Sequence, residues 1–297
     1  MTGFQPRARI GTSAWNKPHW RGHFYPTGLV QRRELEYAAS RLSTLEINTT
    51  FHGLPRPSSY VKWGAETPDD FIFSVKGNKA ITHDNSLKNP ARGIVAFLAS
   101  GVLTLQQKLG PILWQIPERL PFQHDTVEAF LAALPNSVDE MRRLAEQHGV
   151  PGTDEASWGA DRPIRHCFEV RHPSFLTPAF TELLRHYAVA AVVTNSPGWP
   201  VIHDVTSDFV YVRLHGDLTH YPNGYDEATL DNWARLVGGW RSGEACPDGQ
   251  GRDVFVYFDN PDSSGTRSPF DAMSLQARLD GRSLLSPAVT QPTLWTE

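Results

Sequence analysis

Acidic and basic side chains stand close together at the end of one segment that otherwise has the pattern of a buried strand. In HCFEVRHPSF, residues 166–175, Glu169 and Arg171 are two positions apart, and His172 follows directly. Alternate residues of a strand point to the same face, so the carboxylate and the guanidinium would meet. Charged groups in a water-poor site must pair or shift their pKa values. This segment is therefore a candidate for acid–base chemistry or for binding an anion.

Polar strand ends recur along the chain. Eight short apolar or aromatic segments alternate with turn residues or helical patterns, and seven of them finish in polar or ionisable groups. If these side chains face inward they form two layers, with Glu46, Glu169 and Arg213 deeper, and Asn48, Arg171, His215 and Asp259 nearer the opening. We call the space that they enclose the polar cup. Any single Glu–Arg pair could be purely structural, but seven such strand ends favour a ligand-binding or catalytic site.

The residue types in the predicted polar cup suggest a division of roles. The candidate catalytic residues are Glu46, Glu169, His172, His215 and Asp259, with Glu169 or Glu46 as general acid or base and a histidine as proton carrier. The candidate substrate-binding residues are Trp15, Asn48, Lys76, Gln115, Arg171, Arg213, Tyr257 and Asn260. Lysine and arginine bind phosphate and carboxylate groups well, so we expect a small anionic or sugar-like ligand.

The same residues give little support to a bound metal. Suitable donor atoms are present on Glu46, Glu169, His172, His215 and Asp259. However, the chain has no HxH, HExxH or ExxH spacing, and Arg171 and Arg213 would repel a cation. The sequence therefore predicts no metal and identifies no cofactor. Cys167 and Cys246 form no CxxC pair, which excludes a cysteine-based zinc site and fits a reducing compartment.

The elements that would position these residues alternate between strand and helix. The predicted strands cover residues 8–13, 43–49, 71–76, 110–116, 166–171, 189–195, 209–215 and 254–260. The predicted helices cover residues 29–42, 57–66, 90–107, 124–134, 136–148, 177–187, 226–241 and 268–280, with Asp226 and Ser268 as candidate caps. Eight such repeats over about 250 residues predict an α/β fold, a single (β/α)8 barrel of the TIM type, in which active sites lie at the carboxyl ends of the strands.

One connection departs from an ideal barrel. Residues 196–208 are few and rich in proline, so we expect no helix between the sixth and seventh strands. A doubly wound open sheet is the alternative fold, but the chain lacks the glycine-rich GxGxxG loop that usually accompanies it. We assign residues 1–281 to one barrel domain and residues 282–297 to a C-terminal tail.

The composition is that of a globular protein with a mild net charge. Of the 297 residues, 40% are hydrophobic, and the formal net charge is −4. This charge disfavours a general nucleic-acid binder. The N-terminal MTGFQPRARIG lacks the apolar run of a signal peptide, and no apolar stretch reaches the length of a membrane span. We expect a cytoplasmic protein with no membrane partner.

Seven segments match one family pattern, in order and across nearly the whole chain. They are IGTSAWNKPHWRGHFYP (10–26), LEINTTFHGLPRPSSYVKWGAETP (45–68), FIFSVKGNKAITH (71–83), LGPILWQIP (109–117), FEVRHPSF (168–175), FVYVRLHG (209–216) and VYFDN (256–260). Together they resemble the family known as domain of unknown function 72. Members of that family resemble TIM barrels, so the resemblance implies the same fold and site position here, but it implies no reaction.

Three functions stay open at this point. The leading hypothesis is an enzyme that acts by acid–base chemistry on a small anionic or polyhydroxylated substrate in the polar cup, with hydrolase, lyase and isomerase reactions all compatible. The second is metal-assisted nucleic-acid processing, by analogy with endonuclease-IV-like barrels, which the net charge disfavours. The third is a sensor that holds a ligand without transforming it.

Overall fold

Eight parallel strands close into a barrel in the order β1 to β8, and β8 pairs with β1 to complete the ring. The strands are β1 Ala8–Thr12, β2 Thr44–Ile47, β3 Ile72–Lys76, β4 Leu109–Gln115, β5 His166–Glu169, β6 Ala190–Thr194, β7 Phe209–Leu214 and β8 Asp253–Phe258. This computed structural model describes residues 5–150, 155–260 and 264–282. The predicted α/β barrel is confirmed, with all eight predicted strands in place.

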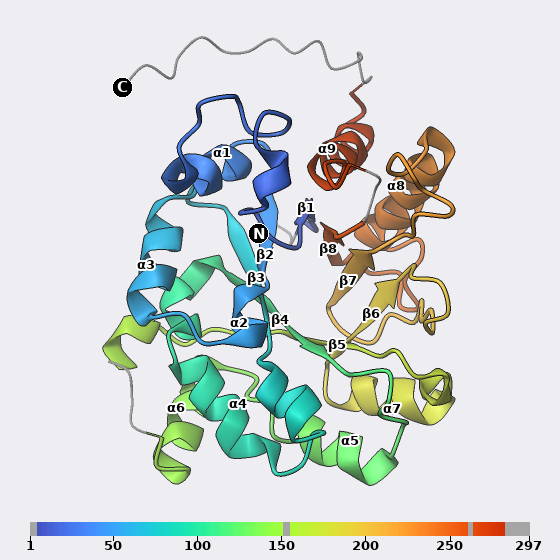
Figure 1. Cartoon of the computed structure of the whole chain (residues 1–297). Helices are drawn as coiled ribbons and strands as arrows, with labels where there is room; N and C mark the ends of the chain where they lie inside the picture. The colour runs from blue at the N-terminus through green and yellow to red at the C-terminus, as the bar shows by residue number, and fades with distance from the viewer. Residues whose placement is uncertain (1–4, 151–154, 261–263, 283–297) are drawn as a thin grey trace.

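Helices cover the outside of the barrel (Figure 1). The α-helices are α1 Glu34–Ala39, α2 Thr49–His52, α3 Pro57–Ala65, α4 Pro90–Ala99, α5 His124–Leu131, α6 Val138–Gln147, α7 Pro178–His186, α8 Glu227–Ser242 and α9 Ser268–Leu279. The strands are almost continuously apolar because helices cover one face and side chains fill the other. The short helix α2 was not predicted. Residues 195–208, between β6 and β7, form no helix, as their prolines predicted.

The predicted helix over residues 90–107 is wrong in its second half. Helix α4 ends at Ala99, and Gly101 adopts a φ of 127°. A Cβ atom at Gly101 would lie only 2.8 Å from a ring carbon of Tyr60, so only glycine fits where the chain turns. The chain then continues as a tighter 3₁₀ helix, Val102–Lys108.

The first predicted helix and one helix cap also differ from expectation. The segment 29–42 contains a 3₁₀ turn, Gln31–Arg33, followed by the short α1. Ser268 is the first residue inside α9 and not its cap, because its hydroxyl donates to the backbone oxygen of Asn260 instead. Asp226 caps α8 as predicted, since its carboxylate accepts a backbone amide in the first turn.

Large side chains fill the inside of the barrel below its carboxyl end. They form one buried cluster that comprises Leu113, Cys167, Ala190, Val192, Phe209, Tyr211, Phe255 and Tyr257. A second and larger buried cluster packs the helices against the barrel. The interior of such a barrel is a packed core and not a pore, so a ligand site must lie at one of its ends.

Two further expectations concern the bounds of the barrel domain and the presence of membrane-spanning helices. The assignment of residues 1–281 to one domain stays a prediction, and the predicted tail lies outside the described residues except for Arg282. Within the described ranges, no helix combines the length and the apolar character that crossing a bilayer requires.

Candidate functional site

Two buried carboxylates share one arginine at the carboxyl end of the barrel. Glu46 is on β2, Glu169 ends β5, and Arg213 is on β7. Nη1 of Arg213 donates to Oε2 of Glu169 at 2.7 Å, and its Nη2 donates to Oε1 of Glu46 at 2.9 Å. The glutamate side chains are 0% exposed and that of Arg213 is 1% exposed. The three residues expected in the deeper layer therefore form one ion-pair network.

The second oxygen of Glu169 is also occupied. Its Oε1 accepts hydrogen bonds from Nε and Nη2 of Arg171, at 2.9 and 2.8 Å. The guanidinium of Arg171 in turn lies over the ring of Trp199, 3.7 Å from the centroid. Burial alone would raise the pKa of Glu169, but the charge of Arg213, followed by the neighbouring His215 and Arg171, outweighs burial and holds this pKa well below its ordinary value. Glu169 is therefore an ionised carboxylate with both oxygens engaged.

Two tyrosines support this network from below. The hydroxyl of Tyr211 donates to Oε2 of Glu46 at 2.6 Å, and the Tyr211 ring lies 5.0 Å from the ring of Tyr257. The Tyr257 hydroxyl makes hydrogen bonds with the hydroxyls of Thr44 and Ser74, at 2.8 and 2.6 Å. Tyr257, which the sequence predicted as a substrate-binding residue, thus lies fully buried in the barrel interior.

A histidine and an aspartate follow the ends of β7 and β8 and stand nearer the opening. Nε2 of His215 accepts a hydrogen bond from Nη1 of Arg213 at 3.1 Å. Arginine can only donate, so a neutral His215 carries its proton on Nδ1, which is 3.9 Å from Oδ2 of Asp259. The other oxygen of Asp259 lies 3.1 Å from Nζ of Lys17. Because His215 and Asp259 are partly exposed, this pair is accessible from the opening.

Among the described residues, Lys76 has no carboxylate partner although it lies close to this network. It ends β3, is 9% exposed, and holds its Nζ 4.3 Å from the centroid of the Phe51 ring. Burial and the charge of Arg213 lower the pKa of Lys76 to about 8, although the two glutamates act in the opposite direction. Burying a cation without a partner is costly, which makes Lys76 a candidate for direct contact with a ligand.

Gln115 and His83 meet beside the same phenylalanine. Nε2 of Gln115 is 3.3 Å from Nε2 of His83, and the His83 ring packs edge-on against Phe51 with centroids 4.9 Å apart. Burial and the charge of Lys76 lower the pKa of His83 to about 4, so this ring is neutral at pH 7. The wall of the polar cup next to Lys76 therefore contains neutral polar groups.

Asn48 contributes an acceptor that is ready for a ligand. Its Nδ2 donates to the backbone oxygen of Ser13 at 2.7 Å, whereas its buried Oδ1 has no hydrogen-bond partner in the part of the chain that the structure describes. A buried acceptor without a donor is unfavourable. A ligand hydroxyl that reached Asn48 would remove this penalty.

Three other predicted site residues make contacts outside the ion-pair network. Nδ1 of His172 accepts a backbone amide in the turn that follows it. Asn260 donates to a carboxylate oxygen of Asp271 at 2.9 Å, which ties the end of β8 to α9. Trp15 packs edge-on against Trp63, with ring centroids 5.3 Å apart. These contacts are structural, and a role in function for the three residues stays a prediction.

Five residues that border the network were not predicted as site residues, namely Lys17, Phe51, His83, Trp199 and Tyr211. Tyr211 precedes Arg213 by two positions on β7, so strand alternation could have identified it. The other four lie outside the strands, and the tertiary fold decides where their side chains go.

One group in the described part of the chain has ligand atoms close enough for a metal ion. It consists of His124, Asp125 and Glu128 at the start of α5. The group is largely exposed, and such acidic surface groups are common without an ion, so we assign no metal to it. In the polar cup, the carboxylates of Glu46 and Glu169 are held by Arg213, which disfavours a cation between them.

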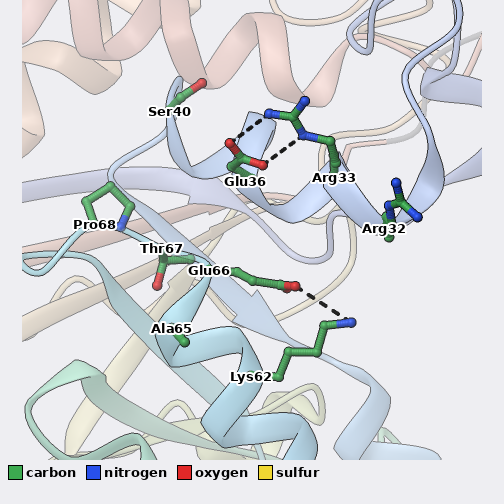
Figure 2. A pocket seen from close by; sticks show the side chains of 9 residues that line it. All are labelled: Arg32, Arg33, Glu36, Ser40, Lys62, Ala65, Glu66, Thr67 and Pro68. Atoms are coloured by element: carbon green, nitrogen blue, oxygen red, sulfur yellow. Dashed lines mark hydrogen bonds and ion pairs between the residues drawn. The ribbon is translucent and has the colours of Figure 1, made fainter. Parts of the chain in front are cut away.

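A groove on the outer surface is separate from the polar cup (Figure 2). It has a volume of about 650 Å³ and lies between α1 and α3. The ion pairs Arg33–Glu36 and Lys62–Glu66 lie along it, at 3.0 and 3.6 Å (Figure 2). Exposed pairs of this kind contribute little energy. We therefore place the candidate site at the strand ends and not in this groove.

Comparison with known proteins places the chain in a family. A family model described as "Protein of unknown function DUF72" matches residues 9–293. The chain belongs to the DUF72 family. Among curated proteins, the "UPF0759 protein YecE" of Escherichia coli (strain K12) is 30% identical over 166 residues, which are 56% of this chain and 49% of that protein. The chain thus spans about half the length of this curated relative.

Solved structures of other DUF72 proteins have the same fold. A DUF72 family protein from Thermotoga maritima superposes with a TM-score of 0.67 at 22% identity, covering 92% of this chain and 99% of its own. One from Enterococcus faecalis gives a TM-score of 0.64 at 16% identity, covering 94% and 97%. At these identities the likeness shows the fold alone, and the function must be argued from the site.

Proposed function

We propose that this protein is an enzyme that acts by acid–base chemistry on a small anionic or polyhydroxylated substrate bound in the polar cup. The observation that carries the proposal is the buried ammonium of Lys76, which has no carboxylate partner among the described residues. Protein interiors rarely keep an uncompensated cation unless it serves function. An anionic group of the substrate would supply the missing partner.

The charge balance of the polar cup supports an anionic ligand. Its carboxylates are those of Glu46, Glu169 and Asp259. Its cations are Lys17, Lys76, Arg171 and Arg213, so one positive charge remains when every carboxylate is ionised. In a buried site, where the effective dielectric constant is low, this excess positive charge favours binding of a phosphate or carboxylate group.

The contacts suggest different roles for the acidic residues. Glu46 and Glu169 use their oxygens to hold arginines and a tyrosine, so we assign them the positioning of Arg171 and Arg213. His215 has its Nδ1 near Asp259 and faces the opening, so we assign proton transfer to this pair. The free acceptor of Asn48 supports recognition of a substrate hydroxyl.

The test begins with binding to the purified full chain. Calorimetry with a panel of small carboxylates and phosphate esters should find at least one ligand, and Lys76→Met should weaken its binding by about tenfold to a hundredfold, since a charged hydrogen bond is lost. The matched control is Lys79→Met, three positions further on and exposed, which should bind as the wild type does.

Turnover then separates an enzyme from a sensor. A ligand that binds through Lys76 should be converted by the wild type and at least about tenfold more slowly by His215→Gln, because one general acid–base group contributes a factor of this size or more. A ligand that binds and is recovered unchanged under all conditions would refute the enzyme proposal and indicate a sensor. Failure of the whole panel to show Lys76-dependent binding would refute the anion site.

A further inference from the structure

We infer that Lys76 is the nucleophile of this site and forms an imine with an aldehyde or ketone carbon of an anionic substrate. The inference rests on the proposed function, because that function brings the substrate to the polar cup. It adds a substrate class, namely small carbonyl compounds with a carboxylate or phosphate group, and a covalent step.

A comparison between two buried lysines shows what is unusual about Lys76. Lys108 is 7% exposed, and its Nζ donates to the backbone oxygens of Gly64 and Thr67, at 2.6 and 2.7 Å. That ammonium is held by its hydrogen bonds and has a structural role. Lys76 is 9% exposed, but within the described residues its Nζ has an aromatic ring, Phe51, as its close contact and no hydrogen-bond acceptor. Within the described residues, the Lys76 nitrogen therefore makes no hydrogen bond that supports the fold.

The surroundings of Lys76 favour the free amine. The charged groups that face it are Glu46 from β2, Glu169 and Arg171 from the end of β5, and Arg213 from β7, and His83 lies beside its Phe51 contact. Burial and Arg213 together bring its pKa to about 8. Roughly a tenth of Lys76 is then amine at pH 7, against well below about 0.1% for a lysine of ordinary pKa. A desolvated lysine of this kind is the usual starting point for imine chemistry.

The covalent step balances without any oxidant or reductant. The amine lone pair attacks the carbonyl carbon and the π electrons move to the oxygen. The nitrogen then releases one of its two hydrogens as a proton and the oxygen takes up a proton, which gives a neutral carbinolamine. A second proton lets the hydroxyl leave as water while the nitrogen keeps one hydrogen, which yields a protonated imine. We assign the supply and recovery of these protons to His215 and Asp259, which lie near the opening.

The protonated imine suits the charges of the polar cup. It carries the same positive charge as the ammonium that it replaces, so Glu46 and Glu169 face a cation in both states. An iminium also draws electrons from the adjoining carbon and acidifies its C–H bond. This gives the acid–base pair His215 and Asp259 a proton to remove, which links the covalent step to the proposed acid–base chemistry.

Reductive trapping tests the inference directly. The full chain is incubated with glyoxylate and sodium borohydride, which reduces an imine to a stable secondary amine, and peptide mass spectrometry locates the label. The six lysines of the chain serve as internal references. Lys76 should be labelled about tenfold faster at pH 7 than the exposed Lys62, because burial lowers the pKa of Lys76 and leaves roughly a tenth of it as amine at that pH. The Lys76 rate should level off above about pH 8.

Variants and a matched ligand separate this inference from the proposed function. Lys76→Arg keeps the cation and should lose the label while still binding glycolate, which has the carboxylate but no carbonyl. Lys79→Arg, an exposed control, should leave labelling of Lys76 unchanged. Labelling of Lys76 no faster than Lys62 would overturn the imine. If labelling showed no preference but glycolate still bound in a way that depended on Lys76, only the imine would be refuted and the anion site would stand. If no member of the carboxylate and phosphate panel bound, both proposals would be refuted.

Discussion

Arg213 and Glu169 form an ion pair that joins β7 to β5 across the mouth of the barrel. The bond from Nη1 to Oε2 is 2.7 Å long, and neither side chain exposes more than 1% of its surface. A buried ion pair of this kind contributes little net stability as a whole, but removing one partner leaves the other buried and uncompensated. The pair therefore fixes the positions of groups in the polar cup more than it stabilises the fold.

Replacement of Arg213 by methionine should destabilise the protein strongly. The change leaves Glu46 and Glu169 without their shared partner, and the expected loss is about 3–5 kcal/mol in the free energy of unfolding. Denaturant unfolding followed by circular dichroism measures this value. Arg32→Met, at an exposed position, is the control and should change stability by less than about 0.5 kcal/mol. Equal effects of the two changes would contradict the buried network.

Acid should weaken the fold partly through Glu169. Its pKa in the folded protein lies well below the ordinary carboxyl value of about 4.3, so its contribution is complete at neutral pH and declines as the pH falls below that value. Glu169→Gln cannot titrate at this position. The stability gap between wild type and Glu169→Gln should therefore narrow as the pH is lowered from about 5 to 3. A gap that stayed constant over this range would show that Glu169 is not an ionised partner.

Lys76→Met should stabilise the protein at neutral pH. The pKa of Lys76 is about 8 in the folded chain and about 10.4 in an unfolded one, so protonation opposes folding below pH 8, and this penalty disappears as the pH rises toward 10. We expect a gain of about 3 kcal/mol at pH 7, measured by thermal and denaturant unfolding, that shrinks toward zero as the pH rises above about 10.

Lys108→Met provides the matched comparison for that change. It removes a buried lysine of similar exposure, but one whose Nζ satisfies the carbonyls of Gly64 and Thr67. The expected result is a loss of about 2 kcal/mol. Opposite signs for the two variants would support a functional Lys76 and a structural Lys108, whereas a loss of stability in both would contradict this distinction.

Tyr211 and Tyr257, whose rings are in contact, should respond differently to loss of their hydroxyls. Tyr211→Phe leaves Oε2 of buried Glu46 without its donor and should cost about 1–3 kcal/mol. Tyr257→Phe removes a partner of Thr44 and Ser74, but the Thr44 hydroxyl keeps its hydrogen bond to the backbone oxygen of Ile72, and the change leaves no carboxylate without a donor, so it should cost less. Denaturant unfolding of both variants checks this ranking of stability losses. Tyr211→Phe should also weaken binding of the ligand found by calorimetry.

The strands and the deeper part of the site were visible in the sequence for physical reasons. A parallel strand covered on both faces is apolar along its length, so segments such as FVYVRLH stand out where polarity begins. The alternation of side chains along each strand is then enough to predict that Glu46, Glu169 and Arg213 lie in one layer. The pairing of neighbouring strands in a closed barrel places their carboxyl ends at the same level, so this part of the prediction follows from the fold and not from a local sequence pattern.

The parts of the site and of the fold that the sequence did not predict depend on packing between segments that are far apart in the chain. Lys17, Phe51 and Trp199 lie outside the strands, and their side chains reach Asp259, Lys76 and Arg171 because of how the chain closes around the opening. The break of a helical pattern at Gly101 likewise follows from contact with Tyr60 on a different helix. Strand alternation predicted that Glu169 and Arg171 meet, but the direct bond between Glu169 and Arg213 of another strand, which changes the role assigned to Glu169, was beyond any local pattern.

The filled interior beneath the polar cup determines how substrate enters the site and how product leaves it. Tyr211, Tyr257 and the apolar residues below them fill the barrel interior, so a ligand of the polar cup must enter and leave at the carboxyl end of the strands. Substrate and product therefore use the same route. A product that keeps its anionic group would occupy the same cation as the substrate. Inhibition by such a product should therefore be competitive.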